Sequence, residues 1–187
     1  MTAVVRLPDA DATRAWGRAL AGVLRAGDLV VLTGDLGAGK TTLTQGLGEG
    51  LGVRGQVASP TFVIAREHPP LPRADGSRGP ALVHVDAYRL GSLDEVEALD
   101  LDAALDEAVT VVEWGAGWVE GLTDDRLELA LQRPHGGVVD DVEDAAAGER
   151  VLTARGVGPR WAGVVLPAEP ASGPDARGAG DRTEEGS

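Results

Sequence analysis

The stretch VVLTGDLGAGKTT, residues Val30–Thr42, holds the only lysine of the chain, Lys40, whereas the other 16 basic residues are arginines. Gly34, four further residues and then Gly39-Lys40-Thr41 fit the phosphate-binding pattern G-x-x-x-x-G-K-[ST]. Glycines let such a loop curl so that successive N–H groups point at phosphate oxygens, and the helix that follows adds its positive end. Lysine suits this position because its ammonium is a compact charge on a flexible stem, whereas the planar fork of arginine needs more room.

The surroundings of this motif favour phosphate binding over a glycine turn with a solvated lysine. An apolar run precedes the loop and a helical pattern follows it, which is the context that a phosphate loop requires. We expect the charge of Lys40 to be exposed when the loop is empty, and the Thr41 hydroxyl to be able to ligate Mg²⁺. The predicted phosphate-binding residues are Asp35, Leu36, Gly37, Ala38, Gly39, Lys40, Thr41 and Thr42.

Two acidic residues end apolar runs further along the chain. ALVHVD ends in Asp86 and VTVVE ends in Glu113, so each carboxylate should emerge at the carboxyl edge of an open α/β sheet, where ligands bind. A phosphate loop needs a carboxylate from a neighbouring strand to hold its metal. Either acid taken singly fits a helix cap or a turn, but two of them beside a phosphate loop favour a functional role.

Other polar and aromatic residues near these acids leave alternatives open. His84, Asp86 and Tyr88 share one face of the predicted strand, and His84 alone is expected to be a structural hydrogen-bonding residue. Trp114 either stacks on a base or covers core. Ser59-Pro60-Thr61 is either an ordinary strand entry or a hydroxyl-bearing loop near the terminal phosphate. The chain has no cysteine, and no histidine–carboxylate cluster has metal-ligand spacing.

Apolar periodicity predicts the elements that must position these residues. A helix is expected over residues 11–26, with Asp11 as its N-cap and Gly27 at its end. A second helix follows the glycine loop, with a leucine every four residues and three glycines that packing must support. A capping box at Ser92 begins a third helix, which runs to about Ala108. Strands are predicted over residues 28–34, 61–68, 81–88, 109–115, 125–131 and 150–156.

This order of elements predicts an α/β fold of the P-loop NTPase-like, three-layer type. Strands alternate with helices in the first 115 residues, which favours a mostly parallel sheet with helices on both faces. The last strands have no helix between them and are expected to pair antiparallel at one edge. The length suits one domain, predicted over residues 1–166, and residues 167–187 lack apolar periodicity and are expected to be a disordered tail.

The charge of the chain limits its partners. The formal net charge is −13 and the arginines form no cluster, which argues against autonomous binding to RNA or DNA. An acidic surface suits a basic protein partner or serves solubility alone. The first residues do not resemble a signal peptide, and no window offers the roughly 18 apolar residues of a membrane span. We therefore expect a soluble cytoplasmic protein with no membrane contact.

Four segments taken together resemble one known family. GDLGAGKTTL, SPTF, HVDAYRL and VEWG occur in this order and spacing, and the similarity to the TsaE family spans about Pro8 to Gly115. The resemblance implies a bacterial P-loop ATPase required for the threonylcarbamoyl modification of adenosine 37 in tRNAs that read codons starting with A. It implies ATP and Mg²⁺ as cofactors and TsaD and TsaB as partners. TsaD performs the transfer onto tRNA, and ATP hydrolysis is thought to reset the complex between turnovers.

The resemblance also implies roles for individual residues. Lys40 and the loop backbone hold the β- and γ-phosphates, and Thr41 and Glu113 ligate Mg²⁺. Asp86 is a further acid needed for activity and orients either the attacking water or a metal-bound water. Trp114 is implied to lie near the nucleotide. The expected catalytic residues are Asp86, Glu113 and Lys40.

Two parts of the chain lie at the limits of this resemblance. Residues 9–13 are implied to border the adenine. After Gly115 the acidic segment GGVVDDVEDAAAGER, residues 136–150, has no detailed counterpart.

Two other functions remain compatible with the phosphate loop. A small-molecule kinase usually adds a lid whose arginines clamp the transferring phosphate, but the longest loop, Pro69–Pro80, offers only Arg73 and Arg78. A nucleotide-dependent binding module differs from an ATPase subunit only in whether hydrolysis is needed.

Overall fold

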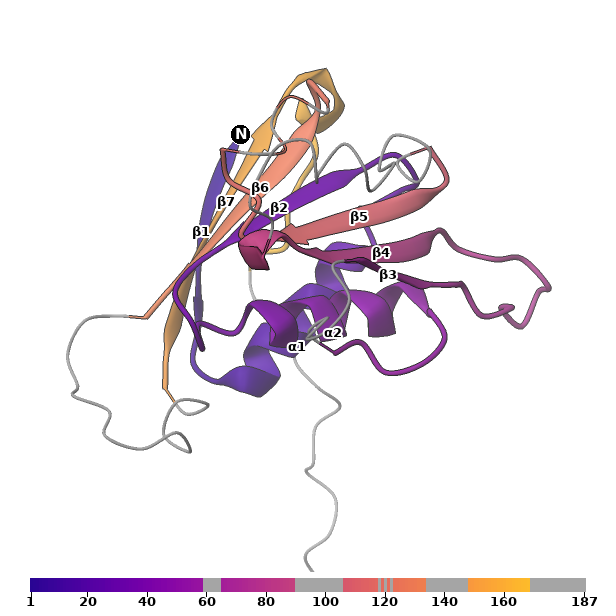
Figure 1. Ribbon diagram of the computed structural model, residues 1–187, viewed down its shortest axis with the longest axis horizontal. Coiled ribbons are helices and arrows are strands. Elements are labelled where there is room, and N and C mark those ends of the chain that lie inside the picture. Colours follow the sequence, from indigo (N-terminus) through magenta and orange to yellow (C-terminus); the bar gives the residue numbers. More distant parts are fainter. Residues whose placement is uncertain are drawn as a thin grey trace, which may run out of the picture.

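In the part of the chain that it describes, the computed structural model has a seven-stranded sheet with two α-helices packed on one side of it (Figure 1). It describes residues 1–58, 65–89, 106–117, 119, 121, 123–133 and 148–168. No helix in these ranges is long and apolar enough to cross a membrane. The helices are α1 (Ala10–Ala21) and α2 (Lys40–Leu51), with short 3₁₀ turns η1 (Ala87–Arg89) and η2 (Pro159–Trp161). The strands are β1 (Thr2–Leu7), β2 (Leu29–Thr33), β3 (Ala65–His68), β4 (Ala81–Asp86), β5 (Ala108–Glu113), β6 (Arg126–Gln132) and β7 (Arg150–Val157).

The sheet is parallel at its centre and antiparallel at both edges. Its strands lie in the order β1-β7-β6-β2-β5-β4-β3, and β2 pairs in parallel with β5 and β6 while β5 pairs in parallel with β4. The predicted α/β class is confirmed. Antiparallel pairing was expected at one edge only, but β3 also pairs antiparallel with β4. The loop Pro69–Pro80 joins these two strands without a helix, and a parallel connection needs a longer crossover.

Apolar composition accounts for the central strands. Leu29–Leu32 of β2 are at most 2% exposed and β5 is buried along its whole length, as expected of parallel strands covered on both faces. Strands β4 to β7 form where the sequence predicts them, to within a few residues. Of the strand predicted over 61–68, the described part is β3. The edge strand β1 is absent from the prediction; only Val5 and Leu7 of it are buried.

Helix α1 begins and ends earlier than predicted. Asp9, and not Asp11, is the N-cap, because the Asp9 carboxylate accepts a hydrogen bond from the Ala12 N–H at 2.7 Å. Asp11 lies in the first turn, where its charge favours the helix dipole. The helix ends at Ala21, and Gly27, with φ of +90°, belongs to the turn that enters β2.

Two predicted segments lie largely outside the described residues. Of the helix predicted from Ser92, only the last three residues are described, and Ala108 already begins β5. Of the predicted tail, Pro167 accepts a hydrogen bond on its carbonyl oxygen from Trp16 Nε1 at 2.9 Å. Residues 169–187 lie outside the described ranges.

Helices α1 and α2 cross with their backbones in close approach. The leucines of α2 are buried, with none more than 5% exposed. A Cβ added at Gly46 of α2 would lie 2.1 Å from the carbonyl oxygen of Arg14, and one at Gly17 of α1 would lie 2.4 Å from that of Leu43. The glycines that weaken α2 intrinsically therefore permit the crossing that stabilises it.

Gly46→Ala tests this crossing. Alanine in place of a helical glycine normally stabilises a helix by about 1 kcal/mol. Here the added methyl group must displace the Arg14 backbone, so we expect the free energy of unfolding to fall by about 1–3 kcal/mol. Urea denaturation measures it, with Gly121→Ala as the control because an added Cβ there meets no atom of the described residues within 4 Å. Unchanged or raised stability of the Gly46 variant would contradict the close crossing.

Candidate functional site

The glycine loop joins the carboxyl end of β2 to the first residue of α2. Gly34 has φ of +141°, and a Cβ there would lie 2.3 Å from the carbonyl oxygen of Leu131 in β6. Gly39 has φ of +106° and is the N-cap of α2. Both positions of the motif therefore require glycine for their backbone conformation, and Gly34 also requires it because β6 approaches closely.

The first turn of α2 offers N–H groups to an anion. Gly39 supplies no side-chain cap, and the first turn contains no acidic residue. The first N–H groups of a helix have no partner within the helix, and they lie at the positive end of its dipole. The start of α2 is therefore suited to bind phosphate oxygens.

Lys40 is buried, and the expectation that its charge is exposed is wrong. The residue is 5% exposed, because the loop folds back over it and offers carbonyl groups. Its Nζ donates hydrogen bonds to the carbonyl oxygens of Gly34, at 2.8 Å, and Asp35, at 3.1 Å. Nζ also lies 3.9 Å from the centroid of the Trp114 ring. Burial lowers the pKa of Lys40, and nearby carboxylates partly offset that effect.

The two predicted acids lie side by side at the carboxyl edge of the sheet. The parallel register pairs Asp86 of β4 with Glu113 of β5, and Glu113 in turn with Leu32, just before the glycine loop. The Thr41 hydroxyl donates to Glu113 Oε1 at 3.2 Å. The structure therefore brings both acids to the start of α2, with Glu113 buried and Asp86 partly exposed.

His84 contacts Glu113, a partner that the sequence does not identify. It is fully buried, and its Nε2 lies 2.9 Å from Glu113 Oε1. Tyr88 does not share this face as predicted. It lies in η1 and is 72% exposed, because β4 ends at Asp86. The Tyr88 N–H donates to Asp86 Oδ1 at 3.1 Å.

Thr41 and Glu113 offer oxygen atoms that suit a hard divalent cation. Within the described ranges, no three His, Cys, Asp or Glu side chains gather into a metal site by themselves. Mg²⁺ at phosphate sites takes one or two carboxylates and otherwise phosphates and water. Both hydrogen bonds to the Glu113 carboxylate end on Oε1, so Oε2 has no donor among the described residues. This donor set fits Mg²⁺ bound together with a nucleotide.

Trp114 covers the loop lysine and not the hydrophobic core. Its φ of +62° is the only positive value at a non-glycine among the described residues, and its N–H donates to the Leu32 carbonyl oxygen at 3.0 Å. The ring lies over Lys40 and 5.3 Å from the Tyr88 ring, centroid to centroid. Such backbone conformations cost about 1–3 kcal/mol and cluster at functional sites.

Arg133 and Arg150 lie beside the loop and are absent from the sequence-based site. Arg133 Nη2 donates to the Gly37 carbonyl oxygen at 3.0 Å, and Arg150 Nε to that of Ala38 at 3.4 Å. Burial lowers the pKa of Arg150, and the charge of Arg133 lowers it further. One arginine follows β6 and the other begins β7, so only the strand order reveals that both reach the loop.

The segment of residues 9–13 also adjoins the loop. A Cβ added at Gly39 would lie 3.8 Å from the Thr13 methyl group, and Thr13 Oγ1 donates to the Asp9 carbonyl oxygen at 2.9 Å. Contact with adenine stays a prediction. Ser59-Pro60-Thr61 lies outside the described residues, so both of its predicted roles remain open.

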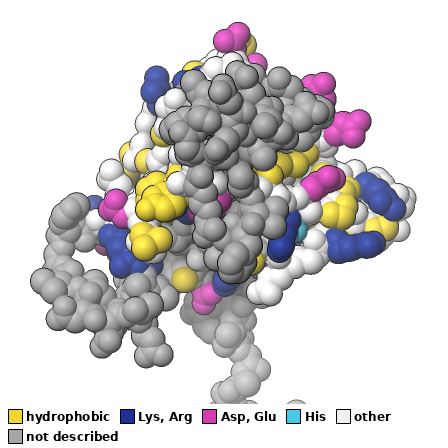
Figure 2. Space-filling view, in the orientation of Figure 1, with side chains coloured by type: hydrophobic (Ala, Val, Ile, Leu, Met, Phe, Trp, Pro, Cys, Tyr) yellow, Lys and Arg dark blue, Asp and Glu magenta, His cyan; other side chains and the backbone are white. Residues whose placement is uncertain are grey.

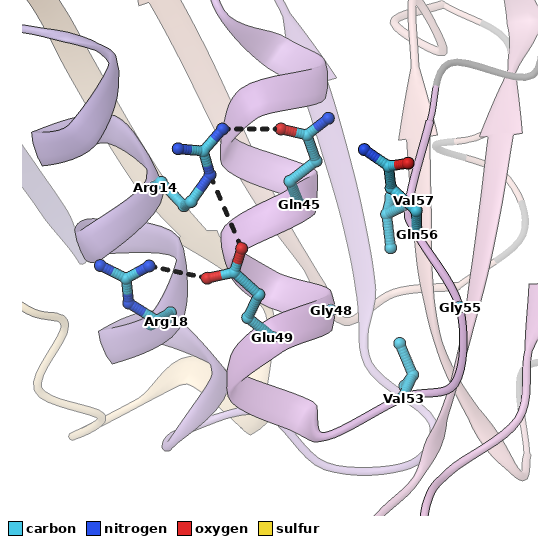
Figure 3. Close-up of a pocket in the computed structure, with 9 residues that line it drawn as sticks. All are labelled: Arg14, Arg18, Gln45, Gly48, Glu49, Val53, Gly55, Gln56 and Val57. Atoms are coloured by element: carbon cyan, nitrogen blue, oxygen red, sulfur yellow. Dashed lines mark hydrogen bonds and ion pairs between the residues drawn. The ribbon is translucent and has the colours of Figure 1, made fainter.

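A separate groove of about 290 Å³ lies between α1, α2 and the chain that follows α2 (Figure 3). Arg14 and Arg18 of α1 both pair with Glu49 of α2, at 3.6 and 2.7 Å, and Arg14 also donates to Gln45 at 3.0 Å. The arginines are thus paired within the protein, and the groove lies along the middle and end of α2, away from its N-terminal N–H groups. The glycine loop is therefore a better candidate for phosphate binding than this groove. The lining residues are Arg14, Arg18, Gln45, Gly48, Glu49, Val53, Gly55, Gln56 and Val57.

The strand, loop and helix around Lys40, with Glu113 on the adjacent parallel strand, define the class of protein. The chain has a P-loop NTPase-like fold, which is a nucleotide-binding architecture.

Comparison with known proteins gives the family. The model described as "Threonylcarbamoyl adenosine biosynthesis protein TsaE" matches residues 7–137. A Streptomyces coelicolor protein named "tRNA threonylcarbamoyladenosine biosynthesis protein TsaE" is 61% identical over 150 residues, covering 80% of this chain and 93% of that protein. A Bacillus subtilis protein of the same name is 37% identical over 157 residues, covering 83% and 87%. The crystal structure of Bacillus subtilis YdiB superposes with a TM-score of 0.61 at 33% identity, covering 87% and 90%. The chain belongs to the TsaE family.

Lys40→Met tests the buried position of the lysine. The variant keeps an unbranched side chain, one atom shorter, but leaves the Gly34 carbonyl without its donor. We expect the free energy of unfolding without nucleotide to fall by about 1–2 kcal/mol, as measured by chemical denaturation. Arg66→Met, at an exposed position of β3, is the control and should change stability little. A Lys40 variant as stable as the parent, or more so, would show that the cost of burying the charge outweighs its hydrogen bonds.

Proposed function

We propose that the chain is the ATP-binding and ATP-hydrolysing subunit of the machinery that forms threonylcarbamoyladenosine at position 37 of tRNAs reading codons that start with A. The observation that carries this proposal is the register that sets Glu113 and Asp86 level with Leu32, beside the glycine loop. The names of relatives that are 61% and 37% identical support the tRNA modification.

In this proposal the loop binds the phosphates of ATP. The N–H groups of the loop and of the first turn of α2, together with Lys40, contact the β- and γ-phosphates. Lys40 exchanges the carbonyl groups of Gly34 and Asp35 for phosphate oxygens, which form stronger hydrogen bonds because they are charged. Thr41 and Glu113 would hold Mg²⁺, which would offset the negative charge of the phosphates.

Asp86 then acts on the water that attacks. It neighbours Glu113 at the edge of the sheet, and the Tyr88 N–H occupies its Oδ1, whereas Oδ2 has no donor among the described residues and can bind water. Asp86 orients this water toward the γ-phosphorus, a P–O bond forms, and the bond to the β-phosphate oxygen breaks to release ADP and phosphate. Phosphoryl transfer depends chiefly on such positioning and on charge stabilisation.

The proposed partners are TsaD and TsaB, with hydrolysis resetting their complex between turnovers in the cytoplasm. The net charge is −13, and in the view of Figure 2 basic side chains lie in separate places among acidic ones. Such a surface repels a polyanion, so tRNA is reached only through the partners. Leu166 is buried in the same core as α1, which supports residues 1–166 as the ATPase domain.

A small-molecule kinase is the second candidate, and Arg133 and Arg150 are the observation that favours it. Kinases use arginines to stabilise the transferring phosphate. Both arginines, however, bind carbonyl groups of the loop, at Gly37 and Ala38. This arrangement supports a role in holding the loop more than a role at the terminal phosphate.

Glu113→Gln and Asp86→Asn separate the two proposed carboxylate roles. An amide lacks the charge that a hard cation requires, so Glu113→Gln should weaken the Mg²⁺-dependent part of ATP binding as well as hydrolysis. Asp86→Asn should reduce hydrolysis more than binding. Calorimetric titration and phosphate release measure both, with Glu67→Gln on β3 as the exposed control. If instead Asp86→Asn abolishes Mg²⁺-dependent binding and Glu113→Gln spares it, the roles are reversed.

Phosphate release from ATP, with and without partners, tests the proposed function. The chain alone should hydrolyse ATP slowly, and TsaB, TsaD and substrate tRNA together should change the rate. Filter binding at physiological salt should detect no tRNA bound by the chain alone. A rate of ATP hydrolysis that is the same with and without the partners would contradict the proposal. Micromolar, salt-sensitive binding of tRNA by the chain alone would also contradict it. Phosphate passed to a small acceptor in place of water would favour the kinase.

A further inference from the structure

His84 is a buried residue of β4 that touches the carboxylate proposed to hold Mg²⁺. It is 0% exposed and Glu113 is 4% exposed, so little solvent reaches the bond between them. In the register of β4 and β5, His84 lies opposite Val111, and two residues further Asp86 lies opposite Glu113. Residues two apart on a strand share a face, so the imidazole and both carboxylates lie on one side of the sheet.

The direction of the bond follows from the groups around it. A carboxylate that binds a cation is ionised and accepts hydrogen bonds, so His84 Nε2 carries the hydrogen and donates it to Glu113 Oε1 at 2.9 Å. His84 Nδ1 has no partner among the described residues. A bare nitrogen acceptor is the less costly group to leave unpaired there, since buried N–H groups without a partner are rarer than under-satisfied acceptors.

Both donors to the Glu113 carboxylate act on the same oxygen atom. His84 Nε2 and the Thr41 hydroxyl lie 2.9 and 3.2 Å from Oε1. Two donors from different elements, β4 and α2, fix the rotation of the carboxylate more firmly than either alone. The other oxygen, Oε2, is then left without a donor among the described residues.

We propose that His84 is a positioning residue that orients Glu113 for Mg²⁺ and thereby sets how strongly Mg²⁺ enhances nucleotide binding. The role rests on the proposed function, because it requires Glu113 to contact the cation. Groups that hold a metal ligand by a hydrogen bond typically change metal affinity 10–100-fold when removed.

The test compares nucleotide binding with and without Mg²⁺ in matched variants. His84→Leu removes the donor, His84→Phe keeps a ring without one, and His84→Gln retains an N–H group at a similar reach. His68 provides the control, because it is also buried, on the adjacent strand, and its Nδ1 contacts the Arg54 carbonyl oxygen at 3.4 Å and no residue of the loop. Calorimetry with ATP gives the affinity of each variant in Mg²⁺ and in EDTA, and thermal unfolding identifies the folded ones.

We expect His84→Leu and His84→Phe to lower the Mg²⁺-dependent gain in ATP affinity by about 10–100-fold. Affinity in EDTA should not change, His84→Gln should recover most of the gain, and His68→Leu should keep all of it. A full gain in either apolar His84 variant, an equal loss in His68→Leu, or no recovery in His84→Gln would overturn the role of His84. If the ATP affinity of the parent protein does not depend on Mg²⁺, or if Glu113→Gln keeps the full Mg²⁺-dependent gain in ATP affinity, the proposed function is contradicted. The role of His84 is then contradicted as well.

Discussion

Parallel pairing of β2, β5 and β4 aligns the carboxyl ends of these strands, and the candidate site depends on that alignment. Leu32, Glu113 and Asp86 lie on neighbouring strands in register, directly beside the loop that leaves β2. A slip of one residue in β5 would turn Glu113 to the opposite face and away from Thr41. The close crossing of α1 and α2 anchors the helix that carries Thr41, so packing between the helices also positions the chemistry of the loop.

The charged side chains around the loop are buried. Lys40, Glu113 and Arg150 are each at most 5% exposed. Burying a charge is costly unless polar groups compensate it. Carbonyl groups of the loop compensate Lys40, and His84 and Thr41 compensate Glu113. A phosphate group can replace the neutral carbonyl partners of Lys40 with charged ones, which gives the loop a physical reason to bind an anion.

Sequence patterns predicted what depends on local order and missed what depends on contacts between distant segments. The glycine loop, the buried runs of β2 and β5 and the strand-end acids each follow from neighbouring residues. No local pattern shows that His84 meets Glu113, that Arg150 reaches Ala38, or that Lys40 is buried, because each needs the strand order and the path of the loop. The strand β1 was missed because a short edge strand buries few side chains, and the cap of α1 was misplaced by two residues because Asp9 and Asp11 are both acceptable caps.

A direct measurement can test whether Lys40 lies at the phosphates of bound ATP. ATP that carries an acyl group on its terminal phosphate transfers that group to an amine held beside it. Lys40 is the only lysine in the sequence, so an acylated lysine side chain identifies this position without ambiguity. Mass spectrometry should find one acyl group, on Lys40, and excess Mg-ATP should prevent its attachment. No labelling of Lys40, or labelling of Lys40 that excess Mg-ATP does not suppress, would show that Lys40 does not lie at the phosphates.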